Sequence, residues 1–398
     1  MSLSRIAENA TASATMALNA RAKVLAAEGA DIVNFTIGEP DFDTPDYIKQ
    51  SAIRAIQAGY TNYQPASGNA DLRRAIADKL RDDNGLEYEP PQIIVSNGAK
   101  QALYTLMRCL LQQGDEALVV APYWVSYVHQ ARFCGADAIV VDATGDPGLK
   151  PSPSQIHDAV TERTKLLVLN SPSNPTGVVL DRDELAAIVE AALEHDLWII
   201  SDEIYEKLIY DDAEHCSPAG FSDEAYRRVI TVNGFSKTYA MTGWRIGYAA
   251  GPQEVIQPAV RLQSHMTSGA DSIAQQAGIE ALVGPQDDVE EMRQTFDKRR
   301  RLLVGGLNDL PGITCVMPRG AFYAFPDCSG LIGRSAGGQQ IEDSLGLCEA
   351  LLEHARVAAV PGSAFGAEGF LRLHYAKSEE QIETALDRLN TFVNKQLD

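Results

Sequence analysis

The sequence predicts an α/β fold: a large domain with a mostly parallel sheet covered by helices on both faces, and a smaller α+β domain. The first reason is length, because 398 residues exceed what one hydrophobic core usually supports. The second is that continuous apolar runs alternate with helix-like segments between about residues 92 and 250, as parallel strands buried on both faces do. The third is that the pattern changes near residue 287 to amphipathic helices and short strands.

Each strand of the large domain is predicted from one apolar run. We expect strands at residues 92–96, 117–120, 138–141, 165–169, 197–200 and 229–232. Helices are expected over residues 99–111 and 184–194.

The smaller domain is predicted from both ends of the chain. An Arg- and Glu-rich helix is expected over residues 287–310, followed by short strands around Cys315 and Phe322. Helices are expected near residues 342–354 and 378–395, and the N-terminal segment is expected to pack against this part. We therefore predict a small domain of residues 1–45 and 290–398, and a large domain of residues 46–289.

Composition narrows the class of protein. The chain has 34 Lys and Arg against 54 Asp and Glu, and this net charge of −20 argues against nucleic acid and anionic membranes as partners. No run reaches ~18 apolar residues, and the N-terminus lacks the apolar core of a signal peptide. Six widely spaced cysteines without a Cys-x-x-Cys pair fit free thiols in a cytoplasmic protein.

Lys237 is the most informative single residue. It follows the strand expected at residues 229–232 and lies among small and hydroxyl residues. A lysine amine there can form a Schiff base, while Ser236 and Arg245 can hold a phosphate beside it. These are the parts needed to carry pyridoxal phosphate. The alternative is an ordinary solvated lysine.

Three further motifs follow predicted strands, where ligands bind in open α/β sheets. Residues 96–100 lead into a helix N-terminus that suits a phosphate, or form an ordinary tight turn. Two X-Pro steps in residues 170–177 hold the Asn174 amide, which can donate to a phenolate oxygen, or make a structural turn. Asp202 can pair with a protonated ring nitrogen, with Tyr205 near the same oxygen as Asn174, or can cap a helix.

These motifs, with several others, carry a resemblance to a known family. The matching blocks are residues 38–42 (Gly-Glu-Pro-Asp-Phe), Tyr63, 96–100, 121–124 (Ala-Pro-Tyr-Trp), 174–177, 202–205, Ser236 and Lys237 with Arg245, and Arg372. In order and spacing the chain resembles the fold-type I pyridoxal phosphate enzymes, specifically the bacterial aspartate aminotransferase family of class I/II transaminases.

The resemblance implies roles around the cofactor ring. Lys237 is expected to form the Schiff base and to shuttle a proton between the substrate Cα and the cofactor C4′. Asp202 is expected to pair with the pyridine nitrogen, Asn174 and Tyr205 to bind the 3′ oxygen, and Trp124 to stack on the ring.

The resemblance also implies a phosphate site shared between subunits. The N–H groups of Ala99 and Lys100, with Ser236 and Arg245, are expected to bind the phosphate. Tyr63 is expected to reach the phosphate of the neighbouring subunit, so the predicted active unit is a homodimer with shared active sites.

Substrate contacts are predicted less completely. Arg372 is expected to grip the α-carboxylate, because a planar guanidinium suits a bidentate contact, and Gly38 to let the substrate approach closely. A dicarboxylic substrate needs a second cation. Arg108, with Ser13 and Thr15, is a candidate, and a solvated helix residue is the alternative reading of Arg108.

The predicted activity is transfer of an amino group from an L-amino acid, aspartate first, to 2-oxoglutarate by a ping-pong mechanism. An aromatic or broad-specificity aminotransferase and a lyase of the same fold remain as alternatives. A regulator built on this fold usually adds a DNA-binding domain, for which residues 1–37 are too short and insufficiently basic.

Overall fold

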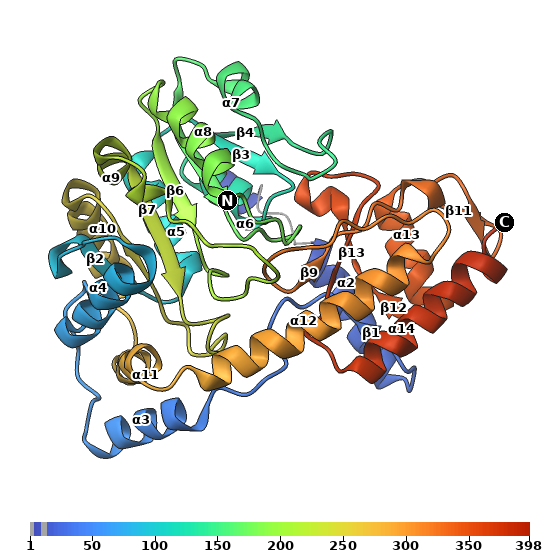
Figure 1. Ribbon diagram of the computed structural model, residues 1–398, viewed down its shortest axis with the longest axis horizontal. Helices are drawn as coiled ribbons and strands as arrows, with labels where there is room; N and C mark the ends of the chain where they lie inside the picture. The colour runs from blue at the N-terminus through green and yellow to red at the C-terminus, as the bar shows by residue number, and fades with distance from the viewer. Residues whose placement is uncertain (1–3, 9–13) are drawn as a thin grey trace.

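A seven-stranded sheet forms the centre of the larger part of the molecule (Figure 1). The computed structural model describes residues 4–8 and 14–398. The strand order is β2-β8-β7-β6-β5-β3-β4, and only β8 runs antiparallel to its neighbours. The strands are β2 Ile93–Ser96, β3 Glu116–Ala121, β4 Asp137–Asp142, β5 Thr164–Asn170, β6 Trp198–Asp202, β7 Val229–Gly234 and β8 Gly247–Ala250. The prediction of a mostly parallel sheet is confirmed, and each apolar run predicted as a strand lies in one.

Both faces of this sheet are buried, which explains the continuous apolar runs. Along β5, Leu166 and Val168 face one apolar cluster, whereas Leu167 and Leu169 face the other. The first cluster includes helices α5 Ala99–Leu110, α6 Ser126–Phe133 and α10 Gln253–Met266. The second includes helices α3 Asp46–Gln57, α4 Ala70–Asn84, α7 Pro153–Ala159, α8 Arg182–Leu193, α9 Asp223–Arg228 and α11 Ser272–Val283, with the short turns η1 Pro90–Gln92 and η2 Pro218–Gly220 nearby.

The smaller part joins the two ends of the chain, and Figure 1 shows α2 and β1 beside the C-terminal elements. β1 Val33–Asn34 pairs in parallel with β12 Val357–Ala358. β14 Leu371–His374 lies between β13 Val360–Pro361 and β9 Tyr323–Ala324, antiparallel to both. The remaining elements are α1 Arg5–Glu8, α2 Ala14–Ala27, β10 Ser335–Ala336, β11 Gln339–Gln340, α13 Ser344–Ala350, α14 Glu379–Thr391, the short 3-10 helices η3 Ser329–Leu331 and η5 Gly362–Phe365, and the π-helices η4 Leu351–Ala355 and η6 Phe392–Gln396.

The long helix α12 Asp287–Asn308 runs from the larger part to the smaller one (Figure 1). Its Arg300 is fully buried and pairs with Asp211 at 2.8 Å, in the segment between β6 and β7. The same guanidinium donates to the Pro318 carbonyl oxygen at 2.6 Å. Helix α12 is thereby fixed to both parts, although the domain limits given above stay a prediction.

The strand expected around Cys315 is wrong. The Cys315 backbone N–H donates to the Asn308 side-chain oxygen at 2.7 Å, and its carbonyl accepts from the Asn308 amide nitrogen at 3.0 Å. One side chain therefore satisfies both backbone groups that a neighbouring strand would otherwise satisfy. A single bridge between Thr314 and Asp327 is the β pairing beside it.

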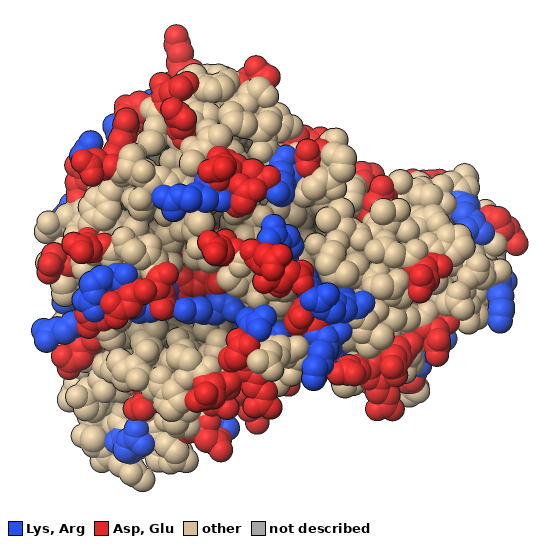
Figure 2. Space-filling view, in the orientation of Figure 1, with Lys and Arg blue, Asp and Glu red and all other residues tan. Residues whose placement is uncertain are grey.

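Charged side chains of both signs lie on the face drawn in Figure 2, where basic residues gather in a band across the middle and acidic residues lie within this band and on either side of it. This face therefore carries no continuous patch of one sign. Within residues 4–8 and 14–398, no helix is long and apolar enough to cross a bilayer.

Candidate active site

A cleft of about 580 Å³ opens where the sheet meets the smaller part. Its floor consists of residues at or just beyond the carboxyl ends of β5, β6 and β7 and at the start of α5, including Asn170, Asp202, Lys237 and Ala99. Its opposite wall comes from residues 36–38 and from Tyr323, Phe365 and Arg372. The strand-end motifs predicted from the sequence therefore meet in one place.

Lys237 reaches into this cleft from the segment after β7. Its Nζ donates to the Gly38 carbonyl oxygen at 2.6 Å. Burial lowers the pKa of Lys237 to about 8; Glu39 opposes this shift, and Arg372 is the strongest of the neighbouring cations that add to it. A substantial fraction of the amine is therefore neutral, and nucleophilic, near pH 8.

Asp202 ends β6 and is 3% exposed. Its Oδ2 accepts from the Tyr127 hydroxyl at 2.6 Å, and its Oδ1 accepts from the Ile204 N–H at 3.3 Å. Burial raises the pKa of Asp202 to about 6, although both hydrogen bonds oppose that shift. A cation placed beside this carboxylate would hold it ionised. Tyr127 could not be predicted, because only folding brings it from the neighbouring helix α6 to Asp202.

The loop after β5 holds the Asn174 amide in the cleft. The Asn174 backbone N–H donates to the Asn170 side-chain oxygen at 2.7 Å, and the Asn170 Nδ2 donates in turn to the Asp202 carbonyl oxygen at 2.8 Å. The Asn174 Oδ1 accepts from Arg372 Nη1 at 3.2 Å. Its Nδ2 remains available as a donor, as the predicted contact with a phenolate oxygen requires.

One corner of the cleft has the composition of an anion site. Helix α5 begins at Ala99 and Lys100, whose N–H groups lie in its first turn, and the buried Ser236 lines the same cleft. The Arg245 guanidinium packs so closely on Gly98 that a Cβ there would lie 2.5 Å from Arg245 Nη2. A helix N-terminus, a hydroxyl and an arginine together suit a phosphate group.

Arg372 supplies a second anion-binding group. It is 5% exposed and donates to the Thr36 carbonyl oxygen at 2.8 Å, and its guanidinium carbon lies over the rings of Tyr323 and Phe365, 4.9 and 5.0 Å from their centres. No carboxylate of the described residues forms an ion pair with it. A buried guanidinium without a carboxylate partner favours the binding of a carboxylate from a ligand.

Trp124 and Lys100 line another part of the cleft. The Lys100 Nζ lies 4.7 Å from the centre of the Trp124 ring, which also meets Tyr127 edge-on. Burial, with Arg245 nearby, lowers the pKa of Lys100. Only the backbone N–H of Lys100 was predicted to bind a ligand, and its side chain lines the cleft as well.

Two predicted residues lie outside the cleft of their own chain. Arg108 is exposed near the far end of α5 and donates to the Cys134 carbonyl at 3.3 Å. It stands nine positions along the helix from Ala99, a rise of about 14 Å, and does not line the cleft, so its predicted contact with a distal carboxylate in this cleft is wrong. Tyr63 is 92% exposed and is absent from the cleft lining. Ser13 lies outside the described residues, as does the side chain of Thr15.

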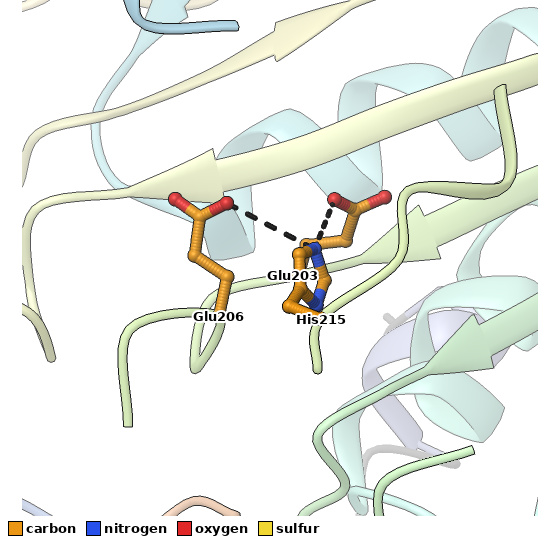
Figure 3. Close-up of side chains that lie close together, drawn as sticks. All are labelled: Glu203, Glu206 and His215. Carbon is orange, nitrogen blue, oxygen red and sulfur yellow. Dashed lines mark hydrogen bonds and ion pairs between the residues drawn. The ribbon is translucent and has the colours of Figure 1, made fainter. Parts of the chain in front are cut away.

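A second cluster of ionisable groups comes from the segment that follows Asp202 (Figure 3). His215 Nε2 lies 2.9 Å from Glu203 and 3.9 Å from Glu206, the one such grouping with metal-ligand spacing among the described residues. Lys79 forms an ion pair with Glu206, and Asn84 donates to it at 2.9 Å. Although burial acts to raise the pKa of Glu206, Lys79 and His215 lower it to about 2. Lys79 thus supplies Glu206 with a positive charge without a metal ion.

Comparison with known proteins agrees with this geometry. The family model for aminotransferase class I and II matches residues 30–389. An aspartate aminotransferase from Bacillus subtilis (strain 168) is 44% identical over 395 residues, covering 99% of this chain and 100% of the relative. An aspartate/prephenate aminotransferase from Cereibacter sphaeroides is 47% identical, covering 96% of both chains.

Solved structures of aminotransferases are similar to this chain as well. The crystal structure of the aspartate aminotransferase from Rhizobium meliloti superposes with a TM-score of 0.97 at 39% identity, and each chain is covered completely. With a family model spanning most of the sequence and relatives this similar along their full length, the chain belongs to the class I and II aminotransferases.

Proposed function

We propose that this cleft binds pyridoxal phosphate and transfers the amino group of an L-amino acid, aspartate first, to 2-oxoglutarate. The observation that carries the proposal is the convergence of three buried groups on one cleft. These are an amine with a lowered pKa (Lys237), a carboxylate with a raised pKa (Asp202) and a guanidinium without a carboxylate partner (Arg372).

The residues present fit the cofactor. The close contact between Gly98 and Arg245, beside the start of α5, leaves a corner suited to its phosphate. Asp202 suits a cationic ring nitrogen, which would offset the burial that raises its pKa. Trp124 offers an aromatic face. When bound, pyridoxal phosphate supplies an electron sink for the carbanion at the substrate Cα.

The side chains then divide the work. Arg372 binds the α-carboxylate and so fixes the substrate Cα within reach of Lys237. Lys237, whose free amine has a lowered pKa, would hold the cofactor and, once a substrate amine has replaced it there, would carry the proton from the substrate Cα to the cofactor C4′. Asp202 would pair with the ring nitrogen, and Asn174 and Tyr205 would donate to the 3′ oxygen.

Aspartate is favoured by the names of the relatives and by one cation in the cleft. Proteins named aspartate aminotransferase match this chain along nearly its whole length. The lysines and arginines that line the cleft are Lys100, Lys237, Arg245 and Arg372. Lys237 is assigned to the Schiff base, Arg245 to the phosphate and Arg372 to the α-carboxylate. Lys100 is therefore left to bind a distal carboxylate. We propose Lys100 for this role in place of Arg108.

Aromatic amino acids are the second candidate substrates. An aromatic aminotransferase from Pyrococcus horikoshii superposes with a TM-score of 0.87 at 39% identity over 95% of this chain. Trp124 and Tyr127 bring aromatic surface to the same cleft. A substrate ring can therefore be accommodated by stacking, whereas Lys100 favours a carboxylate.

We also propose a homodimer. Tyr63 is 92% exposed, and the large apolar side chains of Ile56 and Tyr60, shortly before it in the sequence, are exposed as well, so this segment suits an interface with a second copy. The loop that carries Tyr63 is anchored by Ser272, which donates to the Tyr60 carbonyl at 2.7 Å. In a dimer, Tyr63 would be held against the partner instead of facing solvent.

A donor panel tests the substrate assignment. The purified, cofactor-loaded protein is mixed separately with aspartate, glutamate, phenylalanine and alanine, and its visible absorbance is followed. Rapid loss of the cofactor band with aspartate and glutamate is expected, and Lys100→Met should slow both at least tenfold while sparing alanine. Loss mainly with phenylalanine would assign aromatic substrates. Ammonia or pyruvate release without an acceptor oxo acid would indicate a lyase.

A further inference from the structure

Tyr323 is a cleft residue to which the sequence analysis gave no role. It belongs to the short strand β9, where it pairs with His374 of β14, two residues beyond Arg372. Its side chain is 1% exposed and lines the cleft. A polar hydroxyl buried so completely needs hydrogen-bond partners.

One partner is the hydroxyl of Tyr205, at an oxygen–oxygen distance of 2.9 Å. Burial raises the pKa of both phenols, so both are protonated at neutral pH. Each hydroxyl has one proton to donate. If Tyr205 gives its proton to a ligand oxygen in the cleft, then Tyr323 must be the donor in the bond between the two tyrosines.

The other contact is with Arg372. Its guanidinium carbon lies over the Tyr323 ring, 4.9 Å from the ring centre, and 5.0 Å from the centre of the Phe365 ring. A cation held over an aromatic face is stabilised by the ring and restricted in orientation. The same side chain therefore contacts the hydroxyl that faces the proposed cofactor and the guanidinium that faces the proposed substrate.

Gly38 is fitted to this arrangement. A Cβ at residue 38 would lie 2.3 Å from the Tyr323 hydroxyl oxygen, so no other residue fits without displacing the ring. The Gly38 carbonyl in turn accepts from Lys237. Glycine at this position is thus explained by room for Tyr323, in addition to the predicted room for a substrate.

We propose that Tyr323 is a positioning residue whose hydroxyl donates a hydrogen bond to Tyr205 and whose ring holds the Arg372 guanidinium by stacking. The hydroxyl fixes the direction of the Tyr205 proton toward the 3′ oxygen of the cofactor, and the ring fixes the α-carboxylate clamp. This proposal rests on the proposed function. The hydroxyl and the ring of Tyr323 have different roles, so each can be tested by its own substitution.

Tyr323→Phe tests the hydroxyl. A donor to the 3′ oxygen stabilises the deprotonated form of the lysine-bound cofactor, whose protonation is read from its visible absorbance. When the Tyr205 hydroxyl no longer accepts a hydrogen bond from Tyr323, it donates a weaker hydrogen bond to the 3′ oxygen. The pKa read from the band should rise by about half a unit, while the KM for the amino acid changes less than twofold because the ring remains.

A double-mutant cycle shows whether this effect passes through Tyr205. Tyr205→Phe alone should raise the same pKa further, and adding Tyr323→Phe to it should cause no additional shift. The matched control is Tyr210→Phe, a buried tyrosine whose hydroxyl donates to the Ala321 carbonyl outside the cleft; it should leave the pKa unchanged. Additive shifts, or no shift in Tyr323→Phe, would overturn the role of the hydroxyl.

Tyr323→Leu tests the ring. Loss of the stacking face should weaken binding of maleate, a dicarboxylate without an amino group, about fivefold or more, whereas Tyr323→Phe should bind it as the unmodified protein does. Equal affinities in all three proteins would overturn the clamp. A failure of the proposed function would be recognised in the unmodified protein itself, which would show no cofactor band or no transamination.

Discussion

Lys237 and Asp202 share a property that defines the chemistry at the scale of single residues. Burial shifts both toward their neutral forms, with a lysine pKa of about 8 and an aspartate pKa of about 6. Perturbed groups of this kind collect at catalytic sites. A bound ligand that carries a positive ring nitrogen and a reactive carbonyl carbon would satisfy both, which is why these two side chains support the cofactor assignment.

The raised pKa of Asp202 predicts a pH dependence of stability in the cofactor-free protein. The folded-state pKa of about 6 exceeds the ordinary value of 3.8, so folding favours the protonated carboxyl. Its contribution is complete below about pH 4 and is lost as the pH rises through 6, a change of at most about 3 kcal/mol. Asp202→Asn removes this titration, so the variant should gain stability relative to the unmodified protein across that window. Urea unfolding from pH 4 to 8 measures the difference, and parallel curves would refute the shift.

At the scale of elements, the site depends on where strands end and helices begin. Helix α5 starts at Ala99, immediately after Gly98, whose φ of +82° few other residues adopt. The absence of a side chain at residue 98 lets Arg245 approach the beginning of the helix. The turn between β2 and α5 and the segment after β7 therefore form one anion site.

Gly98→Ala should weaken cofactor binding about tenfold, because the added methyl would displace Arg245 from the phosphate corner. Gly85→Ala is the matched control, since Gly85 ends α4 at φ +67° and a Cβ there meets nothing within 4 Å. Both variants should lose stability from backbone strain. Titration with pyridoxal phosphate below the melting temperature of each protein measures the affinities. Equal weakening in the two variants would mean that strain, and not Arg245, controls binding.

At the scale of the whole molecule, the sheet could be predicted from the apolar runs, whereas in the wall facing it only Gly38 and Arg372 were predicted, through the family resemblance. Continuous apolar runs mark strands buried on both faces, so six strands and the motifs at their ends were predicted. Strand β8, Gly-Tyr-Ala-Ala, was missed because small residues give no such run. Tyr127 and Tyr323 were missed because folding alone brings them to Asp202 and Tyr205. Arg108 was misplaced because sequence proximity to the phosphate loop does not show how far a helix carries a side chain.

The central claim is that Lys237 bears the cofactor, and reduction of the cofactor-loaded protein with borohydride tests it most directly. Reduction makes the lysine linkage permanent, so peptide mass mapping identifies the modified residue. The pyridoxyl group should be found on the peptide containing Lys237 and should be lost in Lys237→Ala, which should also lack transamination. Modification of Lys100, the other lysine of the cleft, or persistent labelling in Lys237→Ala, would contradict the account.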